Sequence, residues 1–484
     1  MNPILITLLI PLTLALLSGF IPERRLKMVN LAGSVLLLIS AILLLISIGQ
    51  QEDLHLNFGA WPEPFGIRFQ ADGLSALLIL VIALVFFCVL LVSLSWQNSA
   101  YQANQYSLMQ GLVASAVAVT MTADLFNLYV WFELMLMSVL GLLVINAKLA
   151  NYEAAIKYFT INMLGTLLML AAIGFIYGSS GHLNFNSLAV AAQNPELAPS
   201  LTLYAGILFI ALLMKMGIFP LFIWLPSSYH ALPLPLLALI GGLLTKVTAY
   251  VLLRLSGQVF SVDAFYDALG WLAVLTMLSG VIGAAYHWDL RRILAFHIVS
   301  QVGFLLLGIA LASQAAAVGT TLFLIHNILV KTNLFLIAGA IWLAVKHYDL
   351  RVIGGLYPSK MLLAILFLIN AMALVGVPPS SGFWGKFLIL KEAFLQEHFI
   401  WAIAALVTGL LTLYSMSKIW LEAFWKPASE PQTLPPIPMT VFAPIILLTL
   451  LVSGIGLYPD PLIVFLNETL SGFYVNPVTQ GGQI

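Results

Sequence analysis

Charged residues and cysteines are what this sequence of 484 residues has least of. Asp, Glu, Lys and Arg make up only 8% of it, whereas 62% is hydrophobic and the mean hydropathy is +1.05. Soluble domains carry about 25% charged residues, so the composition excludes a soluble globular protein and indicates an integral membrane protein. The 19 basic and 19 acidic residues cancel, which gives no sign of a nucleic-acid partner.

The single cysteine, Cys88, excludes an internal disulfide and any cysteine-based metal site. Nothing in the sequence resembles a phosphate-binding loop, a nucleophilic triad, a dinucleotide fingerprint or a Cys/His metal site. We therefore expect no catalytic centre, no metal and no cofactor. The apolar run at 3–20 lacks a preceding positive segment and a small-residue cleavage site, so we interpret it as a retained first helix.

Long apolar runs cross the whole chain. A run of about 20 residues spans a bilayer, and we count about fourteen. They cover 3–20, 28–48, 74–96, 107–123, 126–146, 155–178, 201–225, 236–256, 267–286, 291–312, 317–344, 361–390, 400–424 and 437–457. The sequence thus predicts an all-α polytopic membrane protein.

The lysines and arginines between these runs orient the chain, because cytoplasmic loops are enriched in them. An N-terminus on the outside leaves only Arg68, Arg254 and Lys391 outside. It assigns most basic residues to the cytoplasm: Arg24, Arg25, Lys27, Lys148, Lys157, Arg291, Arg292, Lys346, Arg351, Lys360, Lys418 and Lys426. An even number of spans returns the C-terminus to the outside.

Some ionisable residues fall inside the spans. They are Glu133, Lys215, Lys246, Lys331 and Lys386. A charge at membrane depth costs a few kcal/mol, so it usually faces the bundle interior and belongs to an ion pathway. A single such lysine can instead extend from a helix end to the interface, an alternative that fits Lys386. It does not fit the whole set.

Two spans share an irregularity. "MKMGIFPLFIWLP" (214–226) and "VGVPPSSGFWGKF" (375–387) each combine a lysine with Gly and Pro, and proline breaks a helix. Broken helices occur in membranes where they are buried or line a wet cavity. Such a pair in the two halves of a chain indicates an internal repeat with ion sites at the breaks. The breaks lie in the seventh and twelfth spans, an odd separation, so the second copy would be inverted.

The resulting organisation has four parts. Residues 1–100 hold helices 1–3, and 107–256 hold the first inverted repeat, helices 4–8. Residues 267–424 hold the second repeat, helices 9–13, and 437–484 hold helix 14 and the tail.

Lys215 lies beside the first break. Apolar surroundings favour its neutral amine, whereas a nearby carboxylate favours the ammonium, so a lysine between the two can change protonation when its partner moves. This is relay chemistry for protons. The alternative is a packing kink with a lysine buried by accident.

Six motifs, in order from about residue 120 to 390, resemble the antiporter-like subunit family. They are "WFELM", "MKMGIFPLFIWLP", "GGLLTKVTAYVLLR", "DLRRILAFHIVSQVGFLLLG", "HNILVKTNLFLIAGAIW" and "VPPSSGFWGKF". The family includes the proton-translocating membrane subunits of respiratory complex I and the large subunits of Mrp-type antiporters. Within it, "WPEPFGIRFQADGLSALL" (61–78) resembles the D-type subunits of Mrp antiporters.

The resemblance implies inverted five-helix repeats and an axis of protonatable residues halfway across the membrane. Glu133 matches the family's fifth-helix glutamate, and Lys215 the seventh-helix lysine paired with it. Lys246 matches the connecting lysine and Lys386 the terminal lysine of the twelfth helix. His326 and Lys331 match polar positions of the eleventh helix. Residues five apart point about 140° from each other, so these two join one path only through a distorted helix or bridging waters.

Other polar residues are accessory candidates. Asp72 opens helix 3 and Asp124 ends helix 4, and we interpret both as caps or interfacial residues that could guard an entrance. His230 and His297 could extend the relay, or be satisfied buried histidines.

The favoured function is therefore a subunit of a multisubunit Na⁺(K⁺)/H⁺ antiporter. It would work in a bacterial or archaeal cell membrane with other membrane subunits as partners. One alternative is a proton-pumping subunit of a complex I-like NADH-quinone oxidoreductase or a membrane-bound hydrogenase. Others are an inert assembly scaffold, against which the buried charges argue, and a self-sufficient transporter.

Overall fold

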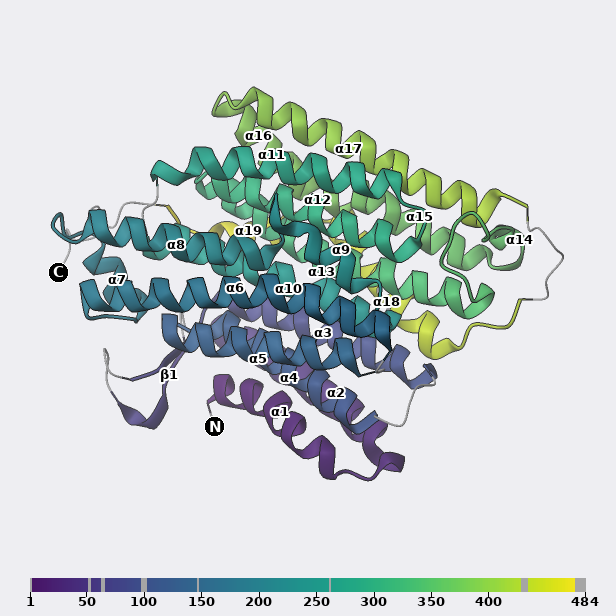
Figure 1. The fold of residues 1–484 in the computed structure, drawn as a ribbon, viewed down its shortest axis with the longest axis horizontal. Helices are drawn as coiled ribbons and strands as arrows, with labels where there is room; N and C mark the ends of the chain where they lie inside the picture. The colour runs from purple at the N-terminus through teal and green to yellow at the C-terminus, as the bar shows by residue number, and fades with distance from the viewer. Residues whose placement is uncertain are drawn as a thin grey trace.

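The computed structural model describes residues 2–50, 54–61, 66–96, 102–145, 148–260, 263–427 and 434–474. These residues form a bundle of long helices and one small hairpin (Figure 1). Parts of three predicted segments lie outside the described residues: 62–65 of 61–78, residue 146 of the fifth span, and 475–484 of the C-terminal tail.

The first part of the chain supplies three long helices and the hairpin. Its elements are α1 (Pro3–Leu17), the 3₁₀ turn η1 (Ser18–Phe20), α2 (Glu23–Ile48), β1 (Leu54–Asn57), η2 (Phe58–Ala60), β2 (Arg68–Ala71) and α3 (Gly73–Ser95). The strands pair antiparallel, with Leu54 opposite Ala71.

The middle of the chain contains the first broken helix. Its elements are α4 (Gln102–Met121), α5 (Leu125–Val144), α6 (Leu149–Ser180), α7 (Phe185–Ala191), α8 (Ala198–Met216), η3 (Leu221–Ile223), α9 (Trp224–Tyr229), α10 (Leu234–Arg254) and the π-helical turn η4 (Leu255–Val259).

The last part contains the second broken helix. Its elements are α11 (Asp263–Tyr286), α12 (Leu290–Ala310), α13 (Gln314–Val345), α14 (Leu356–Ser359), α15 (Met361–Val375), α16 (Ser381–Leu395), α17 (Phe399–Ile419), the π-helical turn η5 (Trp420–Trp425), α18 (Met439–Leu457) and α19 (Asp460–Thr469).

The all-α membrane architecture is confirmed: twelve segments in the described residues are long and apolar enough to span a membrane. The predicted span 107–123 corresponds to α4, which is 20 residues long but begins with polar residues and is not among the twelve. The predicted span 361–390 is divided into α15 and α16, each of 15 residues. The count of fourteen spans stays a prediction.

Several basic residues that were assigned to loops lie inside helices. They are Arg24, Arg25 and Lys27 in α2, Lys157 in α6, Arg254 in α10, Arg291 and Arg292 in α12, Lys391 in α16 and Lys418 in α17.

The helix breaks in the seventh and twelfth predicted spans are confirmed. α8 ends at Gly217, with φ 76°, and α15 ends at Gly376, with φ 92°. Both glycines adopt the left-handed conformation that closes a helix C-terminus and that other residues rarely adopt. Each break leaves helix-terminal carbonyls inside the bundle, where they need donors.

A backbone link of the same kind occurs near both ends of the bundle. Between α4 and α5, Asp124 bridges to Asn184, and the Leu125 N–H donates to Leu183 O over 2.9 Å. Between α11 and α12, Asp289 bridges to Asp349, and the Leu290 N–H donates to Tyr348 O over 2.9 Å. The first link adjoins α7 and the second lies just before α14, at opposite ends of Figure 1. An inverted repeat predicts this arrangement, although its boundaries stay a prediction.

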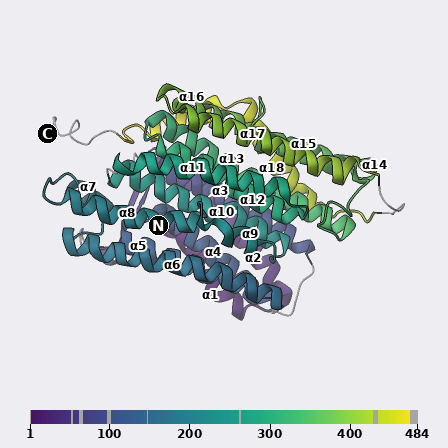
Figure 2. The ribbon, with the colours of Figure 1, turned by 45° about the horizontal axis from the view of Figure 1, so that its top comes forward.

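The deepest helices are α10, α12 and α13, most of whose residues are buried. α1 and α17 run along two opposite edges of the bundle in both views (Figures 1 and 2). The outer helices expose apolar side chains such as Leu167 and Leu410, as expected for surfaces that face lipid or other apolar partners. Polar groups on the central helices must find partners inside the bundle.

Candidate functional site

Lys215 lies in the last turn of α8, next to the first helix break, and only 5% of it is exposed. Its Nζ donates a hydrogen bond to Thr166 Oγ1 of α6 over 2.7 Å and lies 5.4 Å from the centre of the Phe132 ring. Glu133 of α5 lies within electrostatic range. No ion pair joins the two in the described part of the chain, and the buried Glu133 Oε1 has no hydrogen-bond partner. The structure therefore places the predicted pair near each other but not in contact.

A small cavity lies beside Lys215. Its volume is about 10 Å³, room for about one water molecule. Its walls come from α5, α6, α8 and α10: Phe132, Met135, Leu136, Tyr158, Asn162, Lys215, Leu244 and Thr248. Leu244 and Thr248 flank Lys246 in the sequence, so the cavity lies between Lys215 and the part of α10 that carries the next lysine.

Lys246 is fully buried on α10, and its Nζ donates to Gly241 O over 2.7 Å. Helical side chains lean toward the N-terminus of their helix, which explains why it contacts a carbonyl of the preceding turn. Lys246 lies within electrostatic range of Lys331 on α13.

Lys331 and His326 are both buried on α13, which runs as one continuous helix from Gln314 to Val345. His326 Nδ1 lies 2.7 Å from Ser381 Oγ, whereas His326 Nε2 and Lys331 Nζ have no hydrogen-bond partner among the described residues. Because α13 is continuous between His326 and Lys331, a distorted helix does not join the two side chains. A proton path through both of them therefore requires bridging waters.

Lys386 lies on α16, just after the second break, and is 6% exposed. Its Nζ donates to Leu374 O and to Val375 O, each over 2.9 Å, and lies 4.5 Å from the centre of the Phe304 ring. These carbonyls belong to the last turn of α15. Lys386 therefore caps a helix that ends inside the bundle, and the alternative in which it extends to the interface is wrong.

His297 of α12 is fully buried, with Nε2 2.6 Å from Ser415 Oγ and with Nδ1 unpartnered. It lies within electrostatic range of Lys331 and Lys386. The structure thus gathers Lys246, His297, His326, Lys331 and Lys386 into one buried cluster on α10, α12, α13 and α16. We call these five residues the central cluster.

Further polar side chains in and around the central cluster have atoms without a hydrogen-bond partner in the part of the chain that the structure describes. They include atoms of Thr245, Gln301, Thr321 and Asn327, all on α10, α12 and α13. Unpartnered buried polar atoms are rare in proteins and indicate internal water. Sequence analysis missed these residues, and Thr166 as well, because neutral polar residues in apolar helices are common. The four residues on α10, α12 and α13 lie within five residues of a buried lysine or histidine, which could have drawn attention to them, whereas Thr166 has no such neighbour in the sequence.

Asp72 and Asp124 are helix caps, as predicted. Asp72 Oδ1 accepts from the Ser75 N–H at the start of α3, and Asp124 Oδ1 accepts from the Asn127 N–H at the start of α5. Burial raises the pKa of Asp124, although its backbone hydrogen bonds partly oppose this effect. Among the described residues, no member of the central cluster is a hydrogen-bond or electrostatic partner of either aspartate.

Asp72 also forms an ion pair that sequence analysis did not predict. Its Oδ2 lies 2.6 Å from Arg254 Nη2, and Arg254 Nη1 donates to the Tyr250 hydroxyl over 2.6 Å. Burial alone would raise the pKa of Asp72, but the charge of Arg254 and hydrogen bonds from Arg254 and Ser75 outweigh it and hold that pKa below its usual value. Arg254 thus belongs to the helix bundle rather than to an outer loop.

His230 follows α9, with Nδ1 3.1 Å from Pro226 O, and its own carbonyl accepts from Arg291 Nη1 over 2.7 Å. Burial and the charges of Arg292 and Arg291 lower its pKa. The structure places His230 at a loop, away from the central cluster. Among the described residues, no group of His, Cys, Asp and Glu has the arrangement of a metal site.

The chain has clear relatives. Residues 122–412 match the protein family described as "NADH:quinone oxidoreductase/Mrp antiporter, TM". The D-type Na⁺/H⁺ antiporter subunit of Alkalihalophilus pseudofirmus is 36% identical over 431 residues, which cover 88% of this chain and 87% of that protein.

Two solved structures have the same fold. A chain of the Mrp complex from Dietzia sp. DQ12-45-1b superposes with a TM-score of 0.90 at 26% identity, covering 98% of this chain and 97% of its own. A chain of respiratory complex I from Thermus thermophilus superposes with a TM-score of 0.87 at 24% identity, covering 97% and 99%. The latter likeness concerns the fold alone.

Proposed function

The chain belongs to the NADH:quinone oxidoreductase/Mrp antiporter family, and on this premise we propose that it is a subunit of a multisubunit Na⁺(K⁺)/H⁺ antiporter. Its part is to carry protons along Glu133, Lys215, Lys246, His326, Lys331 and Lys386. It is a secondary transporter subunit and not an enzyme.

The observation that carries the proposal is the central cluster with its unpartnered polar atoms. Three lysines and two histidines lie together in a bundle interior where a single uncompensated charge costs several kcal/mol. A scaffold gains nothing from such a cluster, whereas a proton pathway needs groups that exchange protons. Lys331 Nζ and His326 Nε2, both without partners, are the atoms at which a proton would arrive and leave.

The pathway has two sections and a gap. Glu133 and Lys215 form the first section and the central cluster the second. The cavity lined by Lys215, Leu244 and Thr248 lies between them. A water molecule in this cavity would connect the Lys215 amine to α10, and motion of the Lys215 side chain between Thr166 and Glu133 would open or close that connection.

The surroundings of Glu133 support the proposal that this chain works with partner subunits. It is half-buried, and its neighbours on α5, Val130 and Met137, are exposed apolar residues. An unpaired carboxylate at membrane depth is costly against lipid, so this face of α5 is better covered by another membrane subunit. The proposed assembly exchanges H⁺ for Na⁺ or K⁺ across a bacterial or archaeal cell membrane, with both termini of this chain outside.

The second candidate function is a proton-pumping subunit of a complex I-like oxidoreductase or a membrane-bound hydrogenase, which the shared fold favours. The name and extent of the A. pseudofirmus relative favour the antiporter. The two differ in their driving force. An antiporter exchanges ions in response to an ion gradient alone, whereas a redox pump needs an electron donor and acceptor.

Ion flux in vesicles that contain the complete complex tests the proposal. We expect Na⁺- or K⁺-driven proton movement without NADH or quinone, and its loss in Glu133→Gln and Lys246→Met. Matched controls are Glu153→Gln on α6 and Lys346→Met after α13, which make the same chemical changes at exposed positions. The chain alone should give no robust exchange. Flux that requires NADH and quinone would replace the antiporter with the redox pump, and full exchange in both test variants would overturn the relay.

A further inference from the structure

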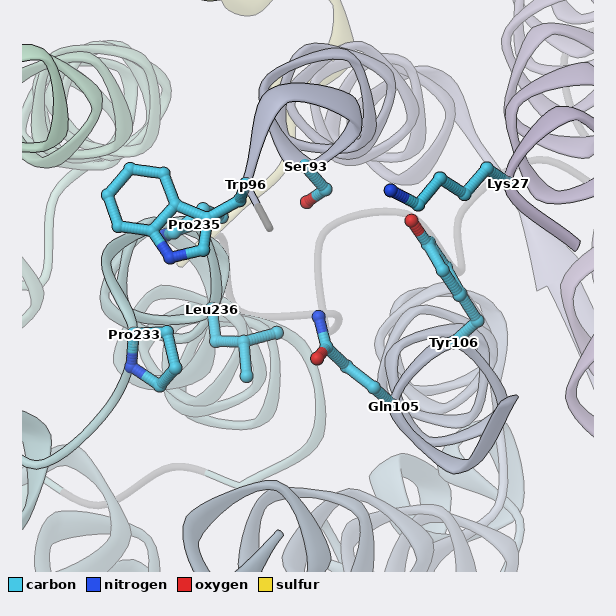
Figure 3. Close-up of a pocket in the computed structure, with 8 residues that line it drawn as sticks. All are labelled: Lys27, Ser93, Trp96, Gln105, Tyr106, Pro233, Pro235 and Leu236. Atoms are coloured by element: carbon cyan, nitrogen blue, oxygen red, sulfur yellow. The ribbon is translucent and has the colours of Figure 1, made fainter. Parts of the chain in front are cut away.

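A recess lies among the ends of α2, α3, α4 and α10, away from the proposed relay. Its volume is about 20 Å³, compared with about 10 Å³ for the cavity beside Lys215, and it opens to the outside. Figure 3 shows its eight lining residues: Lys27, Ser93, Trp96, Gln105, Tyr106, Pro233, Pro235 and Leu236. In the predicted orientation these helix ends lie on the cytoplasmic side.

The recess has a polar half and an apolar half. Lys27, Gln105 and Tyr106 point their polar ends toward the same space, whereas Trp96, the two prolines and Leu236 line the other side (Figure 3). Ser93 donates its hydroxyl proton to Val89 O over 2.9 Å, so it offers only lone pairs to the recess. The available donors are therefore the Lys27 ammonium, the Gln105 amide and the Tyr106 hydroxyl.

These three donors lack partners. Among the residues that the structure describes, none of the three side chains makes a hydrogen bond or an ion pair, although only 3% of Tyr106 is exposed. Among the described residues, no Asp or Glu lines the recess, so they do not balance the positive charge of Lys27 there. The Tyr106 hydroxyl and the Lys27 ammonium both face this open recess, and a ligand that accepts hydrogen bonds and carries negative charge pairs with both of them at once.

We propose that this recess binds the phosphate group of an anionic phospholipid of the inner leaflet. Basic pockets between transmembrane helices on the cytoplasmic side suit such headgroups, and a tryptophan at that level is typical of the membrane interface. The apolar half distinguishes a lipid from a free anion, because Trp96 and Leu236 offer a surface to the glycerol and upper acyl chain that inorganic phosphate cannot use.

A lipid bound in this recess would contact helices from different parts of the chain. Lys27 lies near the start of α2, Tyr106 near the start of α4, and Leu236 near the start of α10. A bound headgroup therefore ties the first helices to α10, which carries Lys246. Lipid binding stabilises the assembled bundle, since a ligand that binds only the folded state raises its stability.

The test titrates the purified complete complex in detergent with phosphatidylglycerol, phosphatidylcholine or sodium phosphate and follows the thermal unfolding midpoint. Native mass spectrometry counts the lipids retained. Lys27→Gln and Tyr106→Phe are the test variants. Arg24→Gln is the matched control, because it removes the same charge less than one turn away, at an exposed position.

We expect phosphatidylglycerol to stabilise the wild type and Arg24→Gln alike, with phosphatidylcholine weaker. Lys27→Gln should need about fivefold more phosphatidylglycerol for half of the effect and should retain one lipid fewer. Tyr106→Phe should need about threefold more. Tyr106→Phe loses one oxygen atom only, so it tests the site even if Lys27→Gln fails to assemble.

An equal response of Arg24→Gln and Lys27→Gln, with Tyr106→Phe like the wild type, would overturn the site. If sodium phosphate alone reproduces the stabilisation and only Lys27→Gln and Tyr106→Phe lose it, the site binds phosphate but the lipid is the wrong source. None of these readouts depends on ion transport.

Discussion

Replacing Thr166 with valine tests the contact on which Lys215 rests in this structure. Thr166 is 1% exposed and accepts the hydrogen bond from Lys215 Nζ over 2.7 Å, in place of a direct ion pair with Glu133. Valine has nearly the same shape but no oxygen. A hydrogen bond to a charged group contributes about 1.5–3 kcal/mol, so its loss shifts the balance from ammonium to neutral amine by about tenfold to a hundredfold.

The assay is the initial rate of cation-driven proton movement in vesicles with the complete complex, measured with a pH-sensitive dye over a range of pH. We expect Thr166→Val to be about tenfold slower near neutral pH and to recover partly in more acidic buffer, which restores the ammonium. Thr166→Ser keeps the hydroxyl and should retain most activity. Thr160→Val is the control, since Thr160 lies on the same helix but is exposed and bonds only to Ile156 O. A Thr166→Val rate equal to that of Thr166→Ser at every pH would refute the reasoning.

The remaining predictions concern stability and orientation. Asp72→Asn keeps the α3 cap but removes the buried ion pair with Arg254, so it should lower the free energy of unfolding by about 3 kcal/mol. Asp349→Asn removes the more exposed ion pair with Arg351 and should change the melting temperature little. Equal effects of the two substitutions would contradict the argument from burial. Because the folded pKa of Asp72 is depressed, this stabilisation is fully present above the unfolded pKa and is lost as pH falls through the folded value. The melting temperatures of the wild type and Asp72→Asn should therefore begin to approach each other only below about pH 4 and meet at still lower pH. Gly376→Ala should lower the free energy of unfolding by about 1 kcal/mol or more, because Gly376 has a positive φ and the added Cβ would lie only 3.0 Å from Lys386 Cδ. Gly409→Ala is the control and should be neutral or stabilising, because nothing lies within 4 Å of its added Cβ. A larger loss of stability in Gly409→Ala than in Gly376→Ala would contradict the argument that a side chain strains the backbone at the break. After replacement of the buried Cys88, a single cysteine near Arg25 or Arg351 should react with an impermeant reagent only from the cytoplasmic side, and labelling from outside in intact cells would reverse the orientation.

The sequence predicted the helix breaks because their causes are local. Glycine and proline act on the backbone within a turn, so 214–226 and 375–387 identified the ends of α8 and α15 without knowledge of the fold. The burial of Lys215, Lys246 and Lys331 was likewise predictable, since no loop was available to hold them, whereas the sequence left open whether Lys386 reaches the interface.

The partners of these lysines could not be predicted in the same way. Lys215 contacts Thr166 across α6 and α8, and Arg254 pairs with Asp72, which is 182 residues earlier in the chain. Such contacts depend on which helix packs against which. Hydropathy does not predict this packing when nearly every helix face is apolar. The hairpin of β1 and β2 was missed for a related reason, because its strands of four residues are shorter than the patterns that periodicity detects.

The most direct test of the proposed relay is ion flux through the complete complex with Lys215 replaced by arginine and by methionine. Arginine preserves the positive charge but does not release its proton inside a protein, whereas methionine removes the charge and keeps the apolar fit. If Lys215 exchanges protons, both variants should assemble and both should lose cation-driven proton movement, with Glu133→Gln equally inactive. Near-normal flux from Lys215→Arg would show that this lysine supplies only a fixed charge, and would contradict the relay.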